Sequence, residues 1–132
     1  MRQKKIIVAG HISLDITPAF ENASGQRFFD ILKPGKLVNV GAAQISKGGA
    51  VSNTGLALHK LGTDVTLMGK TGKDLFGEVL RKQISETGCR MDMILSDTDE
   101  TSYTIVIAPK GSDRAFLHDP GCNNTFTYDE MD

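Results

Sequence analysis

The chain has 132 residues, of which 39% are hydrophobic and 23% charged, and its formal net charge is −1 from 15 basic and 16 acidic side chains. This length is enough for one domain with its own core and short for two. Because the charges are balanced, with no basic run and no acidic tail, the composition argues against nucleic acid or an anionic membrane as a partner.

Cysteine usage and hydropathy indicate the compartment. Cys89 and Cys122 are too few and too far apart for a zinc knuckle or a disulfide framework, so we expect buried free thiols in a reducing compartment. The apolar run at residues 6–9 is too short for a signal peptide, and no stretch is long enough to cross a bilayer. These features predict a cytoplasmic protein.

The first part of the chain is predicted to form strands separated by one long loop. Residues 4–9 are a continuous β-branched run, which is typical of a strand buried on both faces. Residues 11–17 alternate apolar and polar side chains, the pattern of a half-exposed strand. The polar stretch 21–35 is predicted as a loop, and residues 37–40 and 43–46 as short strands.

The middle of the chain alternates helices and strands. A helix is predicted at residues 50–61 from the spacing of its apolar side chains, followed by a buried strand at 65–68 and a turn at 69–73. Asp74 is a candidate N-cap of a second amphipathic helix, and residues 91–95 form a third buried strand. Two strand–helix–strand units predict parallel strands joined by right-handed crossovers, hence an α/β fold.

The later part of the chain returns to β structure. Residues 102–108 and 114–118 are rich in β-forming side chains, and the turn residues between them predict a hairpin. Together with residues 12–17 and 37–46, these half-polar strands predict a small sheet beside the parallel core.

The end of the sequence suggests a longer protein. Thr127 and Glu130 fit a capping box, yet the sequence stops after barely one helical turn, which cannot hold itself together. A parallel core of three strands would also leave an uncovered edge. We therefore expect this polypeptide to be the front part of a longer chain.

A pair of glycines, Gly48 and Gly49, ends a β-type run and opens the predicted helix. Glycine lets a ligand approach the backbone closely, and the N–H groups of the first helical turn point to the same place. The nearby Asn53 amide carries both a donor and an acceptor. Asp15 follows the first strand, and its carboxylate can accept hydrogen bonds from two hydroxyls.

These four residues suit a hydroxyl-rich molecule, because ligands of open α/β sheets lie beyond the carboxyl ends of the strands. Simpler interpretations stay open for each of them. The double glycine also fits a turn that needs glycine for backbone reasons, Asp15 a solvated strand residue, and Asn53 a side chain bonded to nearby backbone.

Other motifs fail their own requirements. Gly69-Lys70-Thr71 is similar to the end of a phosphate-binding loop, but that loop needs glycine where this chain has Asp64. The three histidines, His11, His59 and His118, have no zinc-type spacing. No serine has the context of a nucleophile elbow. The sequence offers no metal site and no obvious catalytic base.

Three ordered motifs resemble the ribokinase-like (PfkB-type) carbohydrate kinases. Residues 48–53, then Leu61-Gly62, then Gly72-Lys73-Asp74-Leu75-Phe76-Gly77 are similar to that family's first signature. Residues 8–15 resemble its first strand with a substrate-contacting aspartate. Pro120-Gly121-Cys122-Asn123 resembles the P-G-A-N run after its second lid hairpin.

Two positions depart mildly from the family pattern. Val51 stands where proline is common, and Gly55 where alanine or another small residue is usual. Glycine lowers helix propensity by about 1 kcal/mol relative to alanine, so we expect Gly55 to mark a place where the helix packs closely against a neighbour.

The resemblance implies a ribokinase-like α/β fold: a parallel sheet flanked by helices, with a β lid built from inserted strands and an incomplete C-terminal half. Residues 1–132 would be the N-terminal, substrate-binding part of one kinase domain, with lid segments at about 12–20, 37–47 and 102–119. In this family the lid closes over the sugar and excludes water, so that ATP phosphorylates the sugar instead of being hydrolysed. The lid often forms a dimer interface, so a homodimer is expected.

The resemblance assigns contacts with substrate hydroxyls to Asp15, Gly48, Gly49 and Asn53. It assigns no catalytic residue and no metal ligand to this chain. The family's nucleotide site, its G-A-G-D run with the base aspartate and its magnesium-linked N-x-x-E run all lie in the C-terminal half. We therefore expect ATP and Mg²⁺ to bind the full-length protein and the 132-residue chain alone to be inactive as a kinase.

Other functions fit the same residues. The chain could be a stand-alone sugar-binding or regulatory module without catalysis, or a structural dimerisation unit, and the acceptor of a kinase could be a nucleoside instead of a sugar. Which acceptor is bound depends on lid and loop side chains. Tyr103, His118 and Asn123 are the candidates, and each also suits a structural role.

Overall fold

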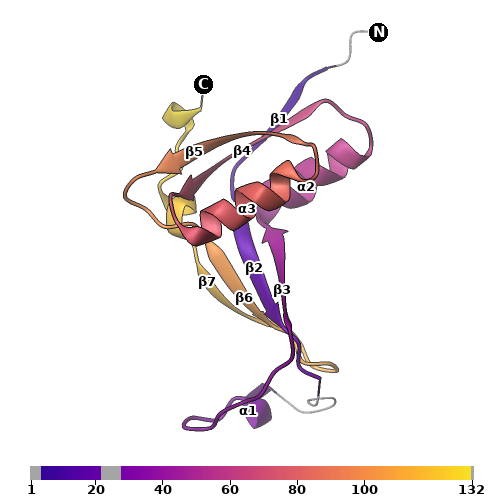
Figure 1. The fold of residues 1–132 in the computed structure, drawn as a ribbon, viewed down its shortest axis with the longest axis vertical. Helices are drawn as coiled ribbons and strands as arrows, with labels where there is room; N and C mark the ends of the chain where they lie inside the picture. The colour runs from indigo at the N-terminus through magenta and orange to yellow at the C-terminus, as the bar shows by residue number, and fades with distance from the viewer. Residues whose placement is uncertain (1–3, 22–27, 132) are drawn as a thin grey trace.

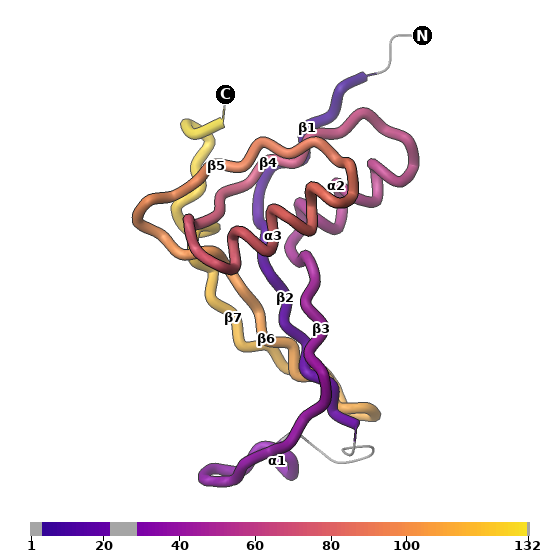
Figure 2. Tube along the Cα trace, viewed as in Figure 1, coloured from indigo at the N-terminus to yellow at the C-terminus, as the bar shows by residue number. Residues whose placement is uncertain are grey.

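The structure, a computed structural model, describes residues 4–21 and 28–131. Figure 1 shows a three-stranded sheet with two helices in the upper part of the molecule, a four-stranded sheet below it, and an arm at the lower end that carries the one-turn helix α1. The trace in Figure 2 shows that the chain runs from β1 directly down into β2 and later returns upward from β3 into α2. The two sheets are therefore joined by continuous chain in several places.

The upper sheet is parallel and forms the core of the molecule. Its strands are β1 (Ile6–Ala9), β4 (Val65–Gly72) and β5 (Arg90–Ser96), in the order β1-β4-β5. The helices that accompany it are α2 (Gly49–Lys60) and α3 (Leu75–Ser85). Apolar side chains of both helices pack on the sheet, with a buried cluster of Ile12, Leu14, Val51, Val65, Leu67, Leu80, Ile84 and Cys89. The predicted α/β fold is confirmed.

The lower sheet, which we call the second sheet, has the strand order β3-β2-β6-β7. Its strands are β2 (Ser13–Pro18), β3 (Ala43–Gly48), β6 (Tyr103–Ile107) and β7 (Ala115–Asp119). Strand β2 pairs antiparallel with β3 and parallel with β6, and β6 and β7 form the predicted antiparallel hairpin. The small sheet expected beside the core is confirmed.

Helix α2 approaches the parallel sheet closely at Gly55. A Cβ at this glycine would overlap the side chain of Leu67 on β4 and lie 3.6 Å from Val8 on β1. The expectation that Gly55 marks close packing is therefore confirmed, and it explains why a weak helix former stands in the middle of this helix.

Two predictions for the connection between β2 and β3 are wrong. Part of the stretch 21–35, predicted as a loop, is the helix α1 (Phe28–Ile31), while residues 22–27 lie outside the described part of the chain. Residues 37–40, predicted as a strand, form none, and Leu37 is 89% exposed. This arm extends beyond the second sheet (Figure 1), and no strand of the described residues pairs with it.

The predicted turn at residues 69–73 is also wrong, because β4 continues to Gly72 and stays paired with β5 as far as Ser96. Two polar side chains of this stretch, Lys70 and Thr71, are buried and have tertiary partners. Lys70 binds Glu130 at 2.8 Å, and Thr71 Oγ1 accepts a hydrogen bond from Arg81 at 2.6 Å. These partners come from elsewhere in the chain, so local sequence could not reveal them.

Strand β1 is less buried than its sequence predicted. Ile6 and Ile7 are 37% and 60% exposed, although residues 4–9 have the apolar pattern of a strand covered on both faces. Strand β1 lies at the edge of the parallel sheet, and β4 is its one strand partner among the described residues. An apolar run thus shows that a strand can be buried, whereas the position of the strand in the sheet decides how much of it is buried.

Two further expectations concern the cysteines and membrane segments. Cys89 and Cys122 are free and buried, as predicted. No helix in the described part of the chain is long and apolar enough to cross a membrane.

The two sheets are held together where β1 leads into β2. The Asn123 side chain accepts a hydrogen bond from the backbone N–H of Ile12 at 3.1 Å and donates one to its carbonyl at 3.0 Å. Both residues are buried, and Asn123 lies in the short 3-10 helix Gly121–Asn124 that follows β7. This paired contact fixes the end of the hairpin against the start of β2.

We predict that Asn123→Ala lowers the free energy of unfolding by about 2–4 kcal/mol, because it leaves a buried donor and a buried acceptor of Ile12 without partners. Urea denaturation measures this change. The matched control is Asn124→Ala, at an exposed neighbouring position, which should shift the free energy by no more than about 0.5 kcal/mol. Equal effects of the two substitutions would contradict the role given to Asn123.

Candidate functional site

The antiparallel pairing of β2 and β3 brings Asp15 against the double glycine. Ser13 pairs with Gly48 and Asp15 with Ser46, so their side-chain positions share one face of the second sheet. The carboxylate of Asp15 lies over the Cα atom of Gly48, where an added Cβ would overlap both of its oxygens. Any other residue at Gly48 would displace this carboxylate.

The Asp15 carboxylate is partly oriented by its own strand. Ser13 Oγ, on a residue that is 5% exposed, donates a hydrogen bond to Asp15 Oδ1 at 3.1 Å. Among the described residues Asp15 has no ion-pair partner, and its side chain is half-buried. The carboxylate therefore retains acceptor capacity for hydroxyl groups of a ligand.

Gly49 makes the turn from β3 into α2 possible. Its φ of +85° is unfavourable for other residues, and a Cβ there would lie 2.6 Å from the carbonyl oxygen of His11. The same carbonyl accepts the N–H of Val51 at 3.1 Å, which ties the start of α2 to the strand entering the second sheet. The helix N-cap is Gly48, which has no side chain to cap the first turn.

Asn53 lies four residues after Gly49, in the second turn of α2, with an exposed side chain. Its amide makes no hydrogen bond with another residue in the described ranges 4–21 and 28–131. The structure thus brings Asp15, Gly48 and Gly49 together in one junction and places Asn53 one helical turn farther along, with its donor and acceptor available.

The three lid candidates differ in position. Asn123 is buried, and both polar atoms of its amide are used by Ile12, which gives it a structural role. Tyr103 pairs with Leu14, on the face of β2 opposite to Asp15, and its ring contacts Phe76 edge-on at a centroid distance of 5.3 Å. His118 is exposed and lies on the same face as Asp15.

The run Gly72-Lys73-Asp74-Leu75-Phe76-Gly77 is a structural joint. Asp74 caps α3, as predicted, by accepting the N–H of Gly77 at 2.8 Å, and its second oxygen accepts the N–H of Thr101 at 2.7 Å. Burial alone would raise the pKa of Asp74, but these hydrogen bonds outweigh it and lower the pKa below its usual value. The motif therefore holds α3 against the start of the β6–β7 hairpin.

The sequence model of the pfkB family carbohydrate kinases matches residues 3–132. The chain belongs to this family. A relative from Archaeoglobus fulgidus, an uncharacterized sugar kinase, is 30% identical over 77 residues, which cover 58% of this chain and 31% of that protein.

Solved structures agree with this membership. Ribokinase from Giardia lamblia superposes with a TM-score of 0.77 at 20% identity, covering 93% of this chain and 38% of that one, which shows a shared fold. A fructokinase with bound ATP from Xylella fastidiosa has a TM-score of 0.65 at 25% identity, and the match covers 88% of this chain and 33% of that chain. The chain thus spans about a third of the length of these family members.

A second cluster of polar residues surrounds Lys70 near the carboxyl end of β4. The sequence did not predict this cluster. Lys70 Nζ lies 2.8 Å from Glu130 Oε1 and 3.9 Å from Asp99, and it donates to the carbonyl of Thr125 at 3.2 Å. The hydrogen bond with Glu130 raises the pKa of Lys70 and lowers that of Glu130. These contacts anchor the 3-10 turn Tyr128–Glu130 to the parallel sheet.

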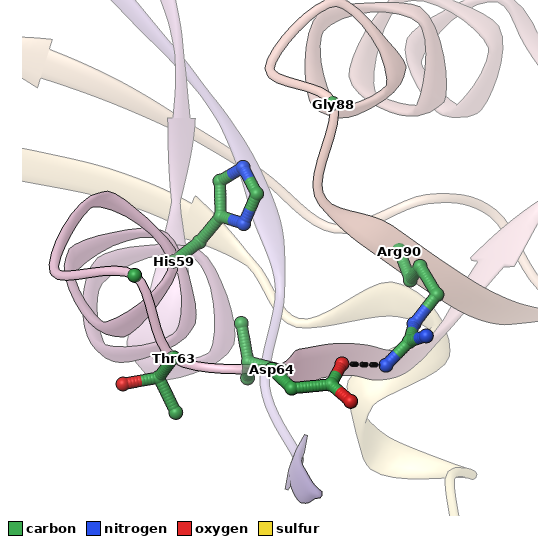
Figure 3. A pocket seen from close by; sticks show the side chains of 7 residues that line it. His59, Thr63, Asp64, Gly88 and Arg90 are labelled. Carbon is green, nitrogen blue, oxygen red and sulfur yellow. Dashed lines mark hydrogen bonds and ion pairs between the residues drawn. The ribbon is translucent and has the colours of Figure 1, made fainter. Parts of the chain in front are cut away.

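One pocket of the described residues lies away from the double glycine. It has a volume of about 300 Å³ and is found at the C-terminal end of α2 and the amino ends of β4 and β5 (Figure 3). Its main polar side chains already have partners: Arg90 pairs with Asp64, and His59 Nε2 lies 3.1 Å from the carbonyl of Thr87. No group of three or more potential metal ligands occurs among the described residues. The Asp15 junction is therefore the candidate site.

We predict that Gly48→Ala destabilises the protein through the Asp15 carboxylate alone, because the backbone at this position (φ −113°, ψ −178°) is open to alanine. The double variant Gly48→Ala/Asp15→Ala should recover about 1–3 kcal/mol of the unfolding free energy lost in Gly48→Ala. Thermal and urea denaturation of the four proteins measure this coupling. If the two substitutions change the unfolding free energy additively, the close contact between Asp15 and Gly48 is wrong. The control is Gly48→Ala combined with Asp113→Ala in the exposed hairpin turn, and equal recovery in that double variant would also count against the contact.

Proposed function

We propose that this chain is the acceptor-binding part and lid of an ATP-dependent sugar kinase, which transfers the γ-phosphate of ATP to a sugar hydroxyl. The observation that supports it most is the Asp15 carboxylate held against Gly48, at the junction of the second sheet and α2, in a chain of a carbohydrate kinase family. The similar fructokinase with bound ATP supports the choice of phosphate donor.

Four residues form the proposed acceptor site. The Asp15 carboxylate would accept hydrogen bonds from two sugar hydroxyls, with Ser13 holding one of its oxygens in place. Gly48 and Gly49 would let the sugar approach the backbone at the first turn of α2, where helix N–H groups favour electronegative atoms. The free amide of Asn53 would bind a further hydroxyl.

We propose that the sites for Mg²⁺ and for the phosphates of ATP belong to the rest of the full-length protein. Residues 4–21 and 28–131 hold no group of three or more potential metal ligands, and the sequence contains no G-A-G-D run. We therefore assign no phosphoryl-transfer step to this chain, and we expect the 132 residues alone to show no sugar-dependent ATP turnover. The buried free thiols of Cys89 and Cys122 are consistent with a cytoplasmic protein.

The second sheet is suited to act as a lid and as an interface with a second copy. Four apolar side chains, one from each strand, pair across its whole width on the face opposite to Asp15: Ile45, Ile16, Ile105 and Leu117. The two residues on the outer strands, Ile45 and Leu117, are 45% and 57% exposed. The same row on a second chain would match it about a two-fold axis, so we propose a homodimer through this face.

For this interface we predict that Leu117→Lys yields monomers in sedimentation experiments, whereas the unchanged protein is a dimer at micromolar concentration. The neighbouring Phe116→Lys is the matched control, because Phe116 has nearly the same exposure, 58% against 57%, and lies on the opposite face of the same strand. The interface is assigned to the wrong face if Phe116→Lys alone dissociates the dimer. A monomeric unchanged protein would exclude the dimer altogether.

The proposed activity is tested on the full-length protein, by measuring phosphate transfer from ATP to a panel of sugars and nucleosides. With the best acceptor, Asp15→Ala should raise KM about 10–100-fold, because hydrogen bonds to a charged acceptor are worth about 1.5–3 kcal/mol. Asp113→Ala, an exposed aspartate in the hairpin turn, should leave KM unchanged.

Other results of the same screen select the other functions. Calorimetric sugar binding without phosphate transfer would indicate a non-catalytic binding or regulatory module, and transfer to nucleosides alone a nucleoside kinase. A protein that binds neither sugars nor nucleosides but forms dimers would be a structural dimerisation unit. An unchanged KM in Asp15→Ala would exclude Asp15 from the acceptor site.

A further inference from the structure

The register of the second sheet places four polar residues in one row on the face of Asp15. Asp15 pairs with Ser46 on β3 and with Thr104 on β6, and Thr104 pairs with His118 on β7. Because residues paired directly across strands share a face, the row crosses the whole sheet from Ser46 to His118. The face that carries Asp15 is thus polar along this row, whereas the opposite face carries the apolar row of the proposed interface.

Within this row Thr104 and His118 form a hydrogen-bonded pair. Thr104 Oγ1 and His118 Nδ1 are 2.9 Å apart. Thr104 is 9% exposed, but the side chain of His118 is exposed. The bond occupies one ring nitrogen and restricts the ring, while Nε2 makes no hydrogen bond with another residue in the described part of the chain. A ring held in this way presents one free nitrogen atom to a ligand.

The position of the pair relative to Asp15 defines what it could contact. Neighbouring strands lie about 4.8 Å apart, so His118, two strands from Asp15, has its backbone about 10 Å away on the same face. Thr104 lies on the strand between them, so its hydrogen bond with His118 holds the ring on the side of β7 that faces Asp15. Asp15 and His118 can therefore contact opposite ends of one bound molecule. Phe116, two residues earlier on the same face of β7, is 58% exposed and adds an apolar surface beside the ring.

We infer that His118 is a specificity-determining residue that hydrogen-bonds a hydroxyl at the end of the acceptor remote from Asp15, and that Thr104 positions its ring. This inference rests on the proposed function, because it requires the acceptor to bind on the Asp15 face. A cross-strand pair also stabilises a sheet, so stability measurements alone cannot separate the two roles. The distinguishing property is discrimination between an acceptor and its analogue lacking one hydroxyl.

The experiment uses the full-length protein and compares ribose and fructose with monodeoxy analogues of each, as acceptors of phosphate from ATP and as ligands in calorimetry. In the unchanged protein, removal of one particular hydroxyl should lower kcat/KM about 10-fold or more, mostly through KM. His118→Leu should lower kcat/KM for the parent sugar to the value for this analogue. The ratio of kcat/KM for the parent sugar to kcat/KM for the analogue then falls to about one. His118→Gln, which retains a donor and an acceptor, should restore part of the ratio.

Thr104 is tested by the conservative exchange. Thr104→Val should reduce the ratio and Thr104→Ser should restore it, although both variants keep the His118 ring. His59→Leu, a histidine in the pocket at the far end of α2, is the control and should leave the ratio unchanged. An effect of Thr104→Val on unfolding alone, with the ratio unaltered, would limit Thr104 to a structural role and overturn its assignment as a positioning residue.

The outcomes separate this inference from the proposed function. If the unchanged protein phosphorylates or binds these sugars but every parent-to-analogue ratio survives in His118→Leu, the inference about His118 is wrong and the acceptor site at Asp15 stands. If no sugar of the set is phosphorylated or bound, the proposed function fails with these acceptors and the inference falls with it.

Discussion

The side-chain amide of Asn123 binds both backbone groups of Ile12, at the point where the chain leaves the parallel sheet and enters the second sheet. This buried contact joins residues 111 positions apart and fixes the place where β2 begins. The pairing of β2 with β3 then determines which side chain stands over which backbone position. Asp15 reaches Gly48 because of that register, and a shift by one residue would turn the carboxylate to the other face.

Aspartate and asparagine residues that lie in family motifs of the sequence have different physical roles in the structure. Asp74 and Asn123 lie in the two most recognisable runs, but their polar atoms are already used by backbone groups of this chain. Asp15 and Asn53 retain unused acceptors or donors beside a helix N-terminus. The availability of polar atoms, more than the motif in which a residue lies, distinguishes a residue that maintains the fold from one that can bind a ligand.

The second sheet separates two kinds of surface because side chains alternate along a strand. One face carries Asp15 together with Thr104 and His118, and the other carries the row from Ile45 to Leu117. A thin sheet with a polar and an apolar face can cover a ligand on one side and pack against protein on the other. This arrangement connects the proposed acceptor site with the proposed interface through a single layer of backbone.

The sequence by itself determined the alternation of strands and helices, the cap at Asp74 and the double glycine at the start of α2, because each depends on local backbone preferences and short-range periodicity. It failed where the deciding partners are distant. Lys70 lies within a strand because β4 pairs with β5 there and because its side chain binds Glu130. Residues 37–40 form no strand, and no strand of the described residues pairs with them. Only the tertiary structure brought Asp15 to Gly48 and His118 to the same face, since strand register depends on contacts between segments far apart in the chain.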